Sequence, residues 1–252
     1  MFTSLFLGGP VPFKSGMKMM ADFEKINWFQ DFPETDGIPF AGYYWGANSS
    51  DITLNSFDSD KPLMVSGVVE NSQGFVTVSR DNYLNTQYKA PVALTVAGVM
   101  RRAAAGGGAN TYAVADFYGA AANAHGFGIG TAVDGRLLVA RQNAGVSGPA
   151  YAYAYASFPE SIQVGDFFAF TSFIRQGTIT IAIYDPSTGK YVSSASSVPG
   201  DIAAGDKDIL IGCKTDNNNS GLATDFKSVV LINGSLTTEQ HIAVQKYLLE
   251  MA

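Results

Sequence analysis

Cysteine and histidine are the scarcest chemically reactive residues in this 252-residue sequence. Cys213 is the only cysteine, so no disulfide can form within the chain, and its place after an apolar run is typical of a small core residue. His125 and His241 are the only histidines, which argues against a zinc site of histidine and cysteine ligands. We expect His125 to lie in an exposed loop and His241 to pack, partly buried, on a helix.

Charge is also sparse, and this excludes several classes of partner. Charged residues make up 15% of the chain, the net charge is −6, and lysine and arginine are scattered, so no basic footprint for nucleic acid exists. No apolar run is long enough to span a bilayer, and residues 1–7 lack the basic start and the length of a secretory signal. We therefore expect no membrane insertion and a protein made in a cytoplasm, even if it acts outside a cell.

Glycine and short apolar runs are abundant, since the chain holds 27 glycines and is 46% hydrophobic. Asp134-Gly135 and Gln176-Gly177 each separate two such runs, which predicts β-hairpins. Many short runs at this spacing predict an all-β fold, a two-sheet antiparallel jelly-roll sandwich with a short C-terminal helix and an irregular N-terminal arm. The main expected strands are 63–69, 92–100, 111–118, 127–133, 136–142, 151–158, 167–175, 178–184, 209–213 and 226–232.

The C-terminal segment carries the most specific structural signal in the chain. A buried strand over 226–232 is followed by an Asn-Gly turn and then by one helix. Thr237 suits the N-cap of that helix, and Gln240 three residues later completes a capping box. Val244 and Leu248 fall on one helical face, so we expect this face to dock on a sheet.

The first 50 residues differ from the rest and are predicted to form a separate arm, with the jelly roll covering residues 51–252. They contain several prolines and an aromatic set without clear periodicity, namely Phe23, Trp28, Phe29 and Trp45. One interpretation is a packing arm that covers an end of the sandwich. The other is an attachment or oligomerisation segment, because large apolar side chains in an aperiodic stretch need a partner surface. A homotrimer would then be the favoured assembly.

Three segments together resemble the concanavalin A-like lectin/glucanase jelly roll in its laminin-G-like form. The first is Tyr83-Leu84-Asn85-Thr86 with the strand that follows it, and the second is the hairpin over 165–184. In that hairpin, Phe167-Phe168 replaces the tryptophan-histidine pair that is usual in the family. The third is the closing unit, which runs from 209–212 through the last strand to the helix start at 236–240.

The resemblance covers residues 63–252 and implies a jelly-roll fold, while function does not follow from fold alone. Such domains occur in glycan-binding modules, polysaccharide-cleaving enzymes, cell-surface receptors, and tail fibres or other virion proteins of tailed bacteriophages. A short, cysteine-poor chain with an aromatic leading segment looks most like the last group.

No catalytic residue is predicted. Jelly-roll glycosidases of the resembled family use a Glu-x-Asp-x-x-Glu pattern, and the nearest match, Glu34-Thr35-Asp36, has Pro39 in place of the final glutamate and lies in a loop. A lyase could use tyrosine with His125 and Arg141, but the sequence does not bring these residues together. We therefore expect a protein that is not an enzyme and has no cofactor.

Two segments could bind sugars. The alternation in 151–158 places Tyr151, Tyr153 and Tyr155 on one face of a strand, either as a platform for sugar rings or as an ordinary sheet-surface ladder. The polar loop at 216–221 supplies hydroxyl-binding groups, or is simply a turn. Its candidate residues are Asp216, as a calcium ligand, and Asn217, Asn218 and Asn219, as glycan ligands.

These observations lead to one functional hypothesis with two alternatives. We expect a non-enzymatic virion protein of a tailed phage, made in the host cytoplasm and acting outside it, whose jelly roll binds surface glycans or decorates the particle. Its partners would be other virion proteins, contacted through the arm, and host surface glycans. The alternatives are a purely structural virion protein without a ligand, and a polysaccharide-cleaving glycosidase or lyase.

Overall fold

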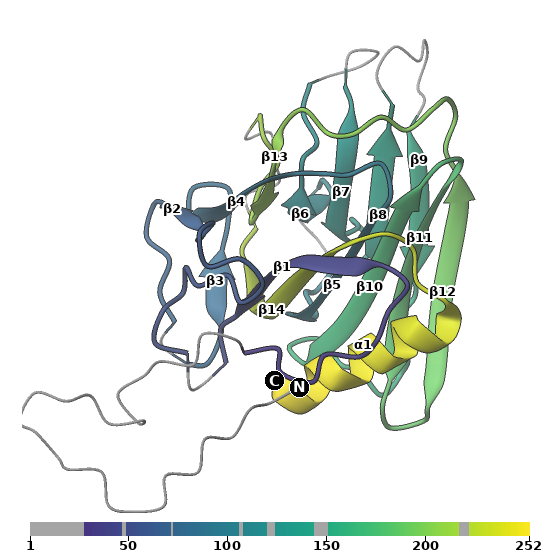
Figure 1. Cartoon of the computed structure of the whole chain (residues 1–252). Helices are drawn as coiled ribbons and strands as arrows, with labels where there is room; N and C mark the ends of the chain where they lie inside the picture. The colour runs from purple at the N-terminus through teal and green to yellow at the C-terminus, as the bar shows by residue number, and fades with distance from the viewer. Residues whose placement is uncertain are drawn as a thin grey trace, which may run out of the picture.

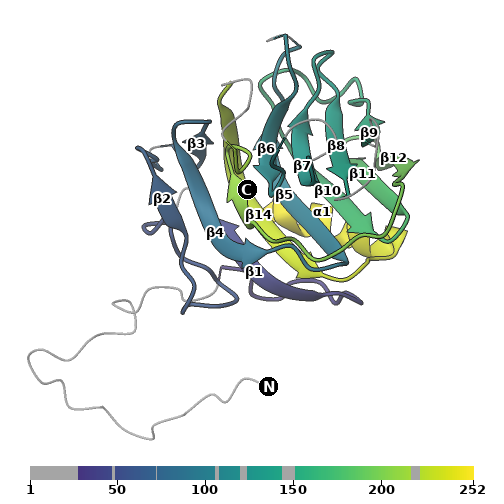
Figure 2. The same cartoon turned by 90° about the horizontal axis from the view of Figure 1, so that it is seen from above.

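The computed structural model describes residues 28–46, 49–71, 73–105, 108–119, 124–143, 151–216 and 222–252. Within these ranges, fourteen strands form two sheets of seven strands each, and one helix follows the last strand. Figures 1 and 2 show the two sheets packed as layers. The predicted all-β sandwich with a C-terminal helix is confirmed. No helix in these ranges has the length and apolar character that a membrane crossing requires.

The two sheets are antiparallel and differ in strand order. The first sheet has the order β1 (Ile38–Tyr44), β14 (Thr224–Asn233), β5 (Leu94–Arg101), β10 (Phe167–Arg175), β11 (Thr178–Asp185) and β12 (Lys190–Ser197), and β3 (Val76–Val78) pairs with β14. The second sheet has the order β2 (Met64–Ser66), β4 (Tyr83–Lys89), β13 (Asp208–Ile211), β6 (Thr111–Ala115), β7 (Gly126–Thr131), β8 (Leu137–Gln142) and β9 (Ala152–Ala156).

Both hairpins predicted from turn residues are present. β7 pairs with β8 across Asp134-Gly135, and β10 pairs with β11 across Gln176-Gly177. Gly135 has a φ of +84° and Gly177 a φ of +73°, values that residues with a Cβ rarely adopt. The sequence signal and the backbone conformation therefore agree at these two turns.

Alternation along the strands divides the apolar side chains between the inside of the sandwich and the outer face of the first sheet. In β5, Val96 and Met100 enter the core between the sheets, whereas Ala97 and Val99 point to the opposite face. A valine or methionine side chain contributes about 1.5–3 kcal/mol when it is fully removed from water. Since both faces of the central strands are buried, a further element has to cover the outer face.

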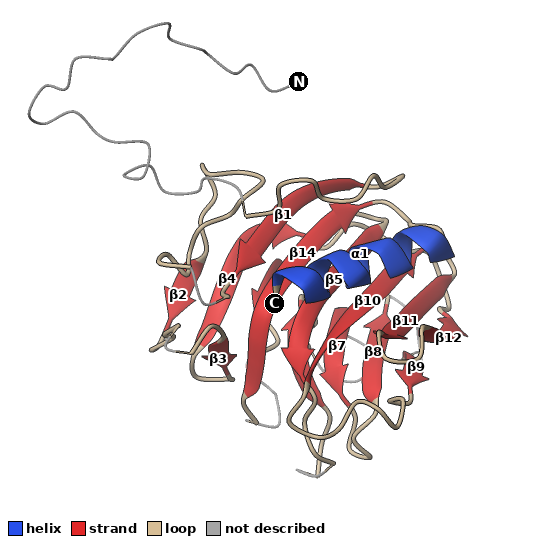
Figure 3. Cartoon of the chain, turned by 90° about the horizontal axis from the view of Figure 1, so that it is seen from below, coloured by secondary structure: helices blue, strands red, loops and turns tan. Residues whose placement is uncertain are grey.

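The helix α1 (Thr238–Met251) provides that cover, and Figure 3 shows it lying across the first sheet. The Thr237 hydroxyl accepts a hydrogen bond from the Gln240 backbone N–H, and the Gln240 side chain accepts one from the Thr237 N–H. This confirms the predicted capping box. Val244 and Leu248 are fully buried against the sheet, also as predicted.

Gln245 is a buried polar residue of the helix that the apolar pattern did not reveal. Its side chain accepts a hydrogen bond from the Tyr184 backbone N–H (2.6 Å) and donates one to the Thr171 hydroxyl (2.9 Å). These two bonds join the helix to β11 and β10. Because both partners are buried, the bonds fix the position of the helix in a way that apolar contacts alone do not.

The segment before residue 50, which was expected to form a separate arm, contributes a strand to the sandwich. β1 pairs with β14 inside the first sheet, and the Trp45 and Phe29 side chains are 0% and 2% exposed. The Trp28 ring lies 5.0 Å from that of Tyr44, in the cluster beneath the helix. Phe29 and Trp45 are therefore core residues of the sandwich, and Trp28 is half-buried against the same cluster. Phe23 lies outside the described residues.

The strand in the supposed arm escaped sequence reasoning because it contains Pro39 and Gly42. Proline is tolerated here because β1 is an edge strand, with an irregular register between Pro39 and Ala41. A Cβ at Gly42 would lie within 2.8 Å of the Phe57 and Phe29 rings, so glycine leaves the space that these rings occupy. In a sequence pattern, Pro39 and Gly42 both argue against a strand, but both fit the edge strand β1.

His241 provides a test of how the helix is packed. Its ring is buried with no hydrogen bond at Nδ1, and burial lowers its pKa to about 4. Because this pKa lies below the unfolded value of about 6.5, the free energy of unfolding is highest above that pH. It decreases by up to about 3 kcal/mol as the pH falls toward 4. We expect His241→Leu to remove this loss, as measured by urea unfolding at about pH 7.5 and about pH 4.5. Equal pH slopes for the two proteins would contradict the assignment.

Candidate functional site

Strand β9 carries two tyrosines on the outer face of the second sheet, and a third, Tyr151, directly precedes it. Ala152, Ala154 and Ala156 point into the core and are nearly fully buried, so the alternating Tyr151, Tyr153 and Tyr155 project outward and are half-buried. This is the face that the alternation predicted. The small alanines let β9 lie close to the first sheet, which it contacts at β11 and β12.

The tyrosine rings form one continuous stack. The ring centroids of Tyr151 and Tyr153, and those of Tyr153 and Tyr155, are 5.9 Å apart, and Phe117 stacks on Tyr151 at 5.7 Å. Tyr112 stacks on Phe117 in turn. We call these five side chains the tyrosine ridge. The Tyr112 and Tyr153 side chains are also joined by a hydrogen bond.

A cation lies at each end of the tyrosine ridge, and both cations are paired. The Arg136 guanidinium lies 4.4 Å from the ring centre of Tyr155 and 2.7 Å from the Asp134 carboxylate. The Lys214 ammonium lies 5.3 Å from the ring centre of Phe117 and 3.5 Å from the Asp216 carboxylate. The ridge therefore gains aromatic–cation contacts without a surplus of positive charge.

The polar loop after Cys213 is only partly described. The Asp216 carboxylate accepts a hydrogen bond from the Gly119 backbone N–H and faces the Lys214 ammonium, which competes with a metal ion for that carboxylate. Asn217, Asn218 and Asn219 lie outside the described residues. In the described ranges, no group of three or more histidine, cysteine, aspartate or glutamate residues could hold a metal ion. Cys213 is buried and free, as expected of a core residue.

A second site, which sequence reasoning did not find, is a cavity of about 240 Å³ at one end of the sandwich. We call it the Asp116 pocket. It lies between the ends of β6, β7 and β8 and the loop that precedes β13. Its lining is Asp116, His125, Gly126, Arg141, Asp201, Ala203, Ala204, Gly205 and Asp206.

Two buried ionisable groups form the floor of this pocket. Asp116 is 2% exposed and Arg141 is 5% exposed. One Asp116 oxygen accepts a hydrogen bond from the Phe127 backbone N–H at 2.7 Å. Burial raises the pKa of Asp116 to about 6, against the opposing effects of that hydrogen bond and of the Arg141 charge. Burial also lowers the pKa of Arg141, with the charge of Asp116 acting in the other direction.

His125 stands beside this pocket and not in a freely exposed loop. Its ring lies 3.2 Å from the Asp206 carboxylate and packs edge-on against Tyr118, with ring centres 4.2 Å apart. The structure thus brings His125 and Arg141 to one cavity, whereas the three stacked tyrosines belong to the outer face of the sheet. The residues named for a lyase therefore do not converge as one set.

Asp116 could have been noticed in the sequence as a carboxylate directly after an apolar run. Nothing in the sequence pairs it with Arg141, which is on another strand, or with Gly205, which is in a distant loop. The carboxylates that were noticed, Glu34 and Asp36, lie before β1. Asp36 accepts a hydrogen bond from Gln240 at the start of the helix, so its role there is structural.

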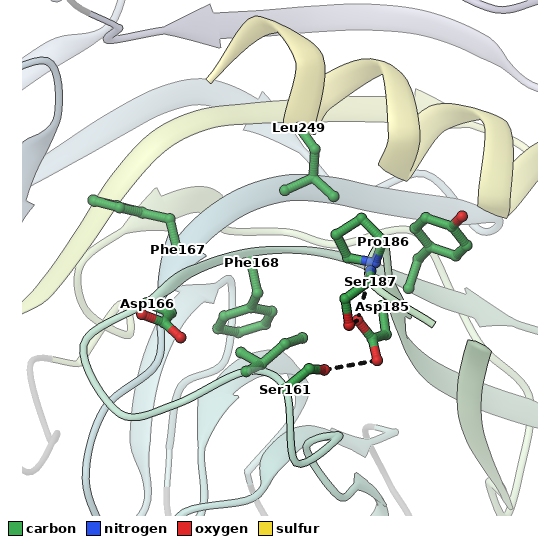
Figure 4. Close-up of a pocket in the computed structure, with 10 residues that line it drawn as sticks. Ser161, Asp166, Phe167, Phe168, Asp185, Pro186, Ser187 and Leu249 are labelled. Atoms are coloured by element: carbon green, nitrogen blue, oxygen red, sulfur yellow. Dashed lines mark hydrogen bonds between the residues drawn. The ribbon is translucent and has the colours of Figure 1, made fainter. Parts of the chain in front are cut away.

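A third cavity, of about 300 Å³, lies between the end of the helix and the ends of β10 and β11 (Figure 4). Its carboxylate, Asp185, accepts hydrogen bonds from the hydroxyls of Ser161, Ser187 and Thr188 at 2.6–2.7 Å. The bond from Thr188, followed by the two from the serines, holds the pKa of Asp185 well below its usual range despite its burial. Since this carboxylate is fully occupied within the chain, its geometry is that of a structural turn.

The sequence matches no protein-family model and no curated protein. Several solved structures share the fold. Domain 4 of AbnA, a GH43 extracellular arabinanase from Geobacillus stearothermophilus solved in complex with arabinotriose, is 12% identical, with a TM-score of 0.53 over 83% of this chain and 98% of that one. The structure named HCR/D-Sa-GBL1/C is 14% identical, with a TM-score of 0.56 over 85% of this chain and 52% of that one.

A weaker likeness relates 93% of this chain to the enzymatically active domain of bacteriophage CBA120 tailspike protein 2, at 15% identity. Its TM-score of 0.48 is too low to support an inference. The chain spans 32% of that domain's length and 48% of the length of a GH54 α-L-arabinofuranosidase that also shares the fold. At these identities the likenesses establish a β-sandwich of jelly-roll type and no activity.

The raised pKa of Asp116 gives a direct test of its burial. A pKa of about 6 in the folded state and of about 3.9 in the unfolded state means that Asp116 adds stability at low pH and that this is lost as the pH rises through 6. Asp116→Asn keeps the acceptor oxygen but does not titrate. The stability of the variant relative to wild type should therefore increase by about 2–3 kcal/mol between about pH 4 and about pH 7.5. A pH-independent difference in urea unfolding would rule out the raised pKa.

Proposed function

We propose that the tyrosine ridge binds an extended, neutral glycan and that the chain acts by binding and not by catalysis. The observation that carries this proposal is the unbroken stack of Tyr151, Tyr153 and Tyr155 on the outer face of the second sheet. The only helix in the described ranges covers the other sheet, so this face carries no such cover. A row of phenol hydroxyls and aromatic ring edges offers hydrogen bonds and apolar contacts along one line, which suits a linear chain of sugars.

Charge favours a neutral glycan over an acidic one. The two cations at the ends of the tyrosine ridge are each paired with a carboxylate. The chain as a whole carries a net charge of −6, so it repels polyanions at long range. Acidic polysaccharides would need basic side chains that are not already neutralised.

The arabinanase domain adds support of a limited kind. It matches almost its whole length to this chain and was solved with arabinotriose. A sandwich of this fold can therefore be used to hold a short chain of sugars in another protein. The position of the tyrosine ridge, and not this likeness, is the reason for placing the glycan here.

We propose the surface of a tailed-phage virion as the setting. The support is the laminin-G-like, concanavalin A-like resemblance argued from the sequence, together with the absence of an internal disulfide and the low content of basic residues. Other virion proteins, and copies of this chain in a trimer, would be contacted through residues 1–27. These residues replace the longer arm as the candidate attachment segment, because Phe29 and Trp45 are core residues and Trp28 packs against them.

Two alternatives are tested by the same preparations. A purely structural virion protein would bind no glycan. A polysaccharide-cleaving enzyme is favoured by one observation, the buried Asp116 carboxyl with a pKa of about 6, since general acids in glycosidases have raised pKa values. Reducing-sugar and unsaturated-product assays on bacterial surface polysaccharides separate this alternative from binding, because turnover would exclude the binding-only proposal.

The central ring of the tyrosine ridge is the most informative substitution. Tyr153→Ala removes a ring that stacks on both neighbours and should weaken glycan binding about 10-fold, whereas Tyr153→Phe removes only the hydroxyl and should cost less. Binding is measured on a glycan array and then by titration calorimetry with the best glycan. Tyr83→Ala, on β4 of the same sheet but outside the ridge, is the matched control. A glycan that binds wild type and Tyr153→Ala equally would refute the ridge as its site.

Truncation tests the attachment segment. Removing residues 1–27 should leave the sandwich folded and reduce its mass in solution to that of a monomer, as measured by light scattering. Removing residues 1–47 should instead prevent folding, because it deletes β1 together with Phe29 and Trp45. An unchanged oligomeric state after the shorter truncation would argue against the segment's role in assembly.

A further inference from the structure

The Asp116 pocket holds a buried acid and a buried base that face one cavity without touching. The charges of Asp116 and Arg141 affect each other's pKa, yet no ion pair or hydrogen bond joins the two side chains. Arg141 uses two of its five N–H groups on protein acceptors, the Asn143 side-chain oxygen and the Ala203 carbonyl. A buried pair that stays apart is costly unless something polar lies between its members.

Two glycines let the backbone pack directly against the Asp116 carboxylate. A Cβ at Gly205 would lie 2.6 Å from Asp116 Oδ2, and a Cβ at Gly126 would lie 2.7 Å from Oδ1. Any other residue at either position would therefore press on the carboxylate. The two glycines therefore fix the position of the carboxylate at the cavity.

The pocket is held in shape by hydrogen bonds outside the cavity. Asn143, which accepts from Arg141, itself donates to the Pro199 carbonyl at 2.8 Å. The covering loop is tied by the Gly205 N–H to the Ala90 carbonyl at 2.7 Å. It is tied again by Gln176, which donates to the Asp201 carboxylate at 2.7 Å. The walls are therefore preorganised and would not have to be ordered by the ligand.

Size and charge define the ligand that fits. The cavity of about 240 Å³ is smaller than the roughly 300–1,000 Å³ of common small-molecule pockets, so it suits one small ring and not an oligosaccharide. Asp116, Asp201 and Asp206 outnumber the basic groups Arg141 and His125, which disfavours an anion. The Arg141 guanidinium disfavours a metal ion. A neutral, hydroxyl-rich molecule satisfies both restrictions.

We propose that the Asp116 pocket binds a single neutral sugar residue or a polyol of similar size. One ligand hydroxyl donates to the Asp116 carboxylate, and a neighbouring oxygen accepts from the Arg141 guanidinium, which fills the gap between the two side chains. His125 and Asp206, joined at 3.2 Å, stand at the rim and limit what can enter. Carboxylate and guanidinium together can recognise two adjacent hydroxyls by their hydrogen-bond polarity.

The pocket is separate from the tyrosine ridge and does not depend on it. Asp116 and Phe117 directly follow β6, and Phe117 joins the ridge while Asp116 lines the pocket. The two sites can therefore be inactivated one at a time. Failure of the glycan proposal would leave the pocket proposal standing, and the reverse also holds.

The test uses the full-length protein and four neutral monosaccharides, glucose, galactose, mannose and arabinose. Binding is measured by saturation-transfer NMR up to about 20 mM, above the roughly millimolar Kd expected of one small site. We expect at least one sugar to bind wild type. Asp116→Asn and Arg141→Met should each weaken it about 10- to 100-fold, because each removes a charged hydrogen-bond partner.

Matched controls are Asp81→Asn and Arg80→Met, an exposed pair outside the pocket, which should bind like wild type. Because substitution of buried charges can unfold a protein, Ala204→Phe is added as a variant that blocks the cavity from an exposed position of its lining. It should abolish binding without loss of thermal stability.

No binding by any of the four sugars, unchanged binding in Ala204→Phe, or loss of binding in Tyr153→Ala alone would overturn the proposal. Preferential binding of inorganic phosphate or calcium would overturn the assigned ligand class.

Discussion

The structure depends on burying both faces of the first sheet. Its central strands are apolar on both sides, so the helix and the aromatic residues around Phe29 have to cover the outer face. Without that cover, Val99, Val230 and Ile232 would be exposed together. The second sheet is built differently. Along its strands, residues that point into the core alternate with residues on the outer face, and small outer residues such as Ala140 let tyrosine rings pack over them. The sheet that no helix of the described residues covers is the one that carries the tyrosine ridge.

The sequence was sufficient wherever the signal was local. The hairpin turns, the Thr237 cap and the alternation of tyrosines in β9 all depend on residues a few positions apart, and the structure has them as predicted. β1 was missed because its partner, β14, is at the far end of the chain, and only that pairing makes a strand of a segment with Pro39. The Asp116 pocket was missed for the same reason, since a strand end, a second strand and a loop have to meet before Asp116 and Arg141 share a cavity.

The two-residue period of a strand explains how the ridge and the pocket coexist. Asp116 and Phe117 are neighbours in sequence, yet one belongs to the pocket and the other to the stack on the outer face. At the same end of the sheet, Arg141 of β8 pairs with Ala152 of β9, which is next to Tyr151. A one-residue shift in either strand would move the charged groups to the outer face and the rings into the sandwich. The registers of β8 and β9 therefore determine both sites at once.

Within the described residues, two aspartates are buried, and their surroundings differ. Asp185 and Asp116 are about equally buried, at 1% and 2% exposed, but their pKa values move in opposite directions. Asp185 accepts hydrogen bonds from three hydroxyls, and these bonds lower its pKa. Asp116 has one backbone partner and an arginine that it does not reach, so its burial works against folding at neutral pH. A buried carboxyl with a raised pKa that lines a cavity beside a buried arginine is a candidate for binding a ligand.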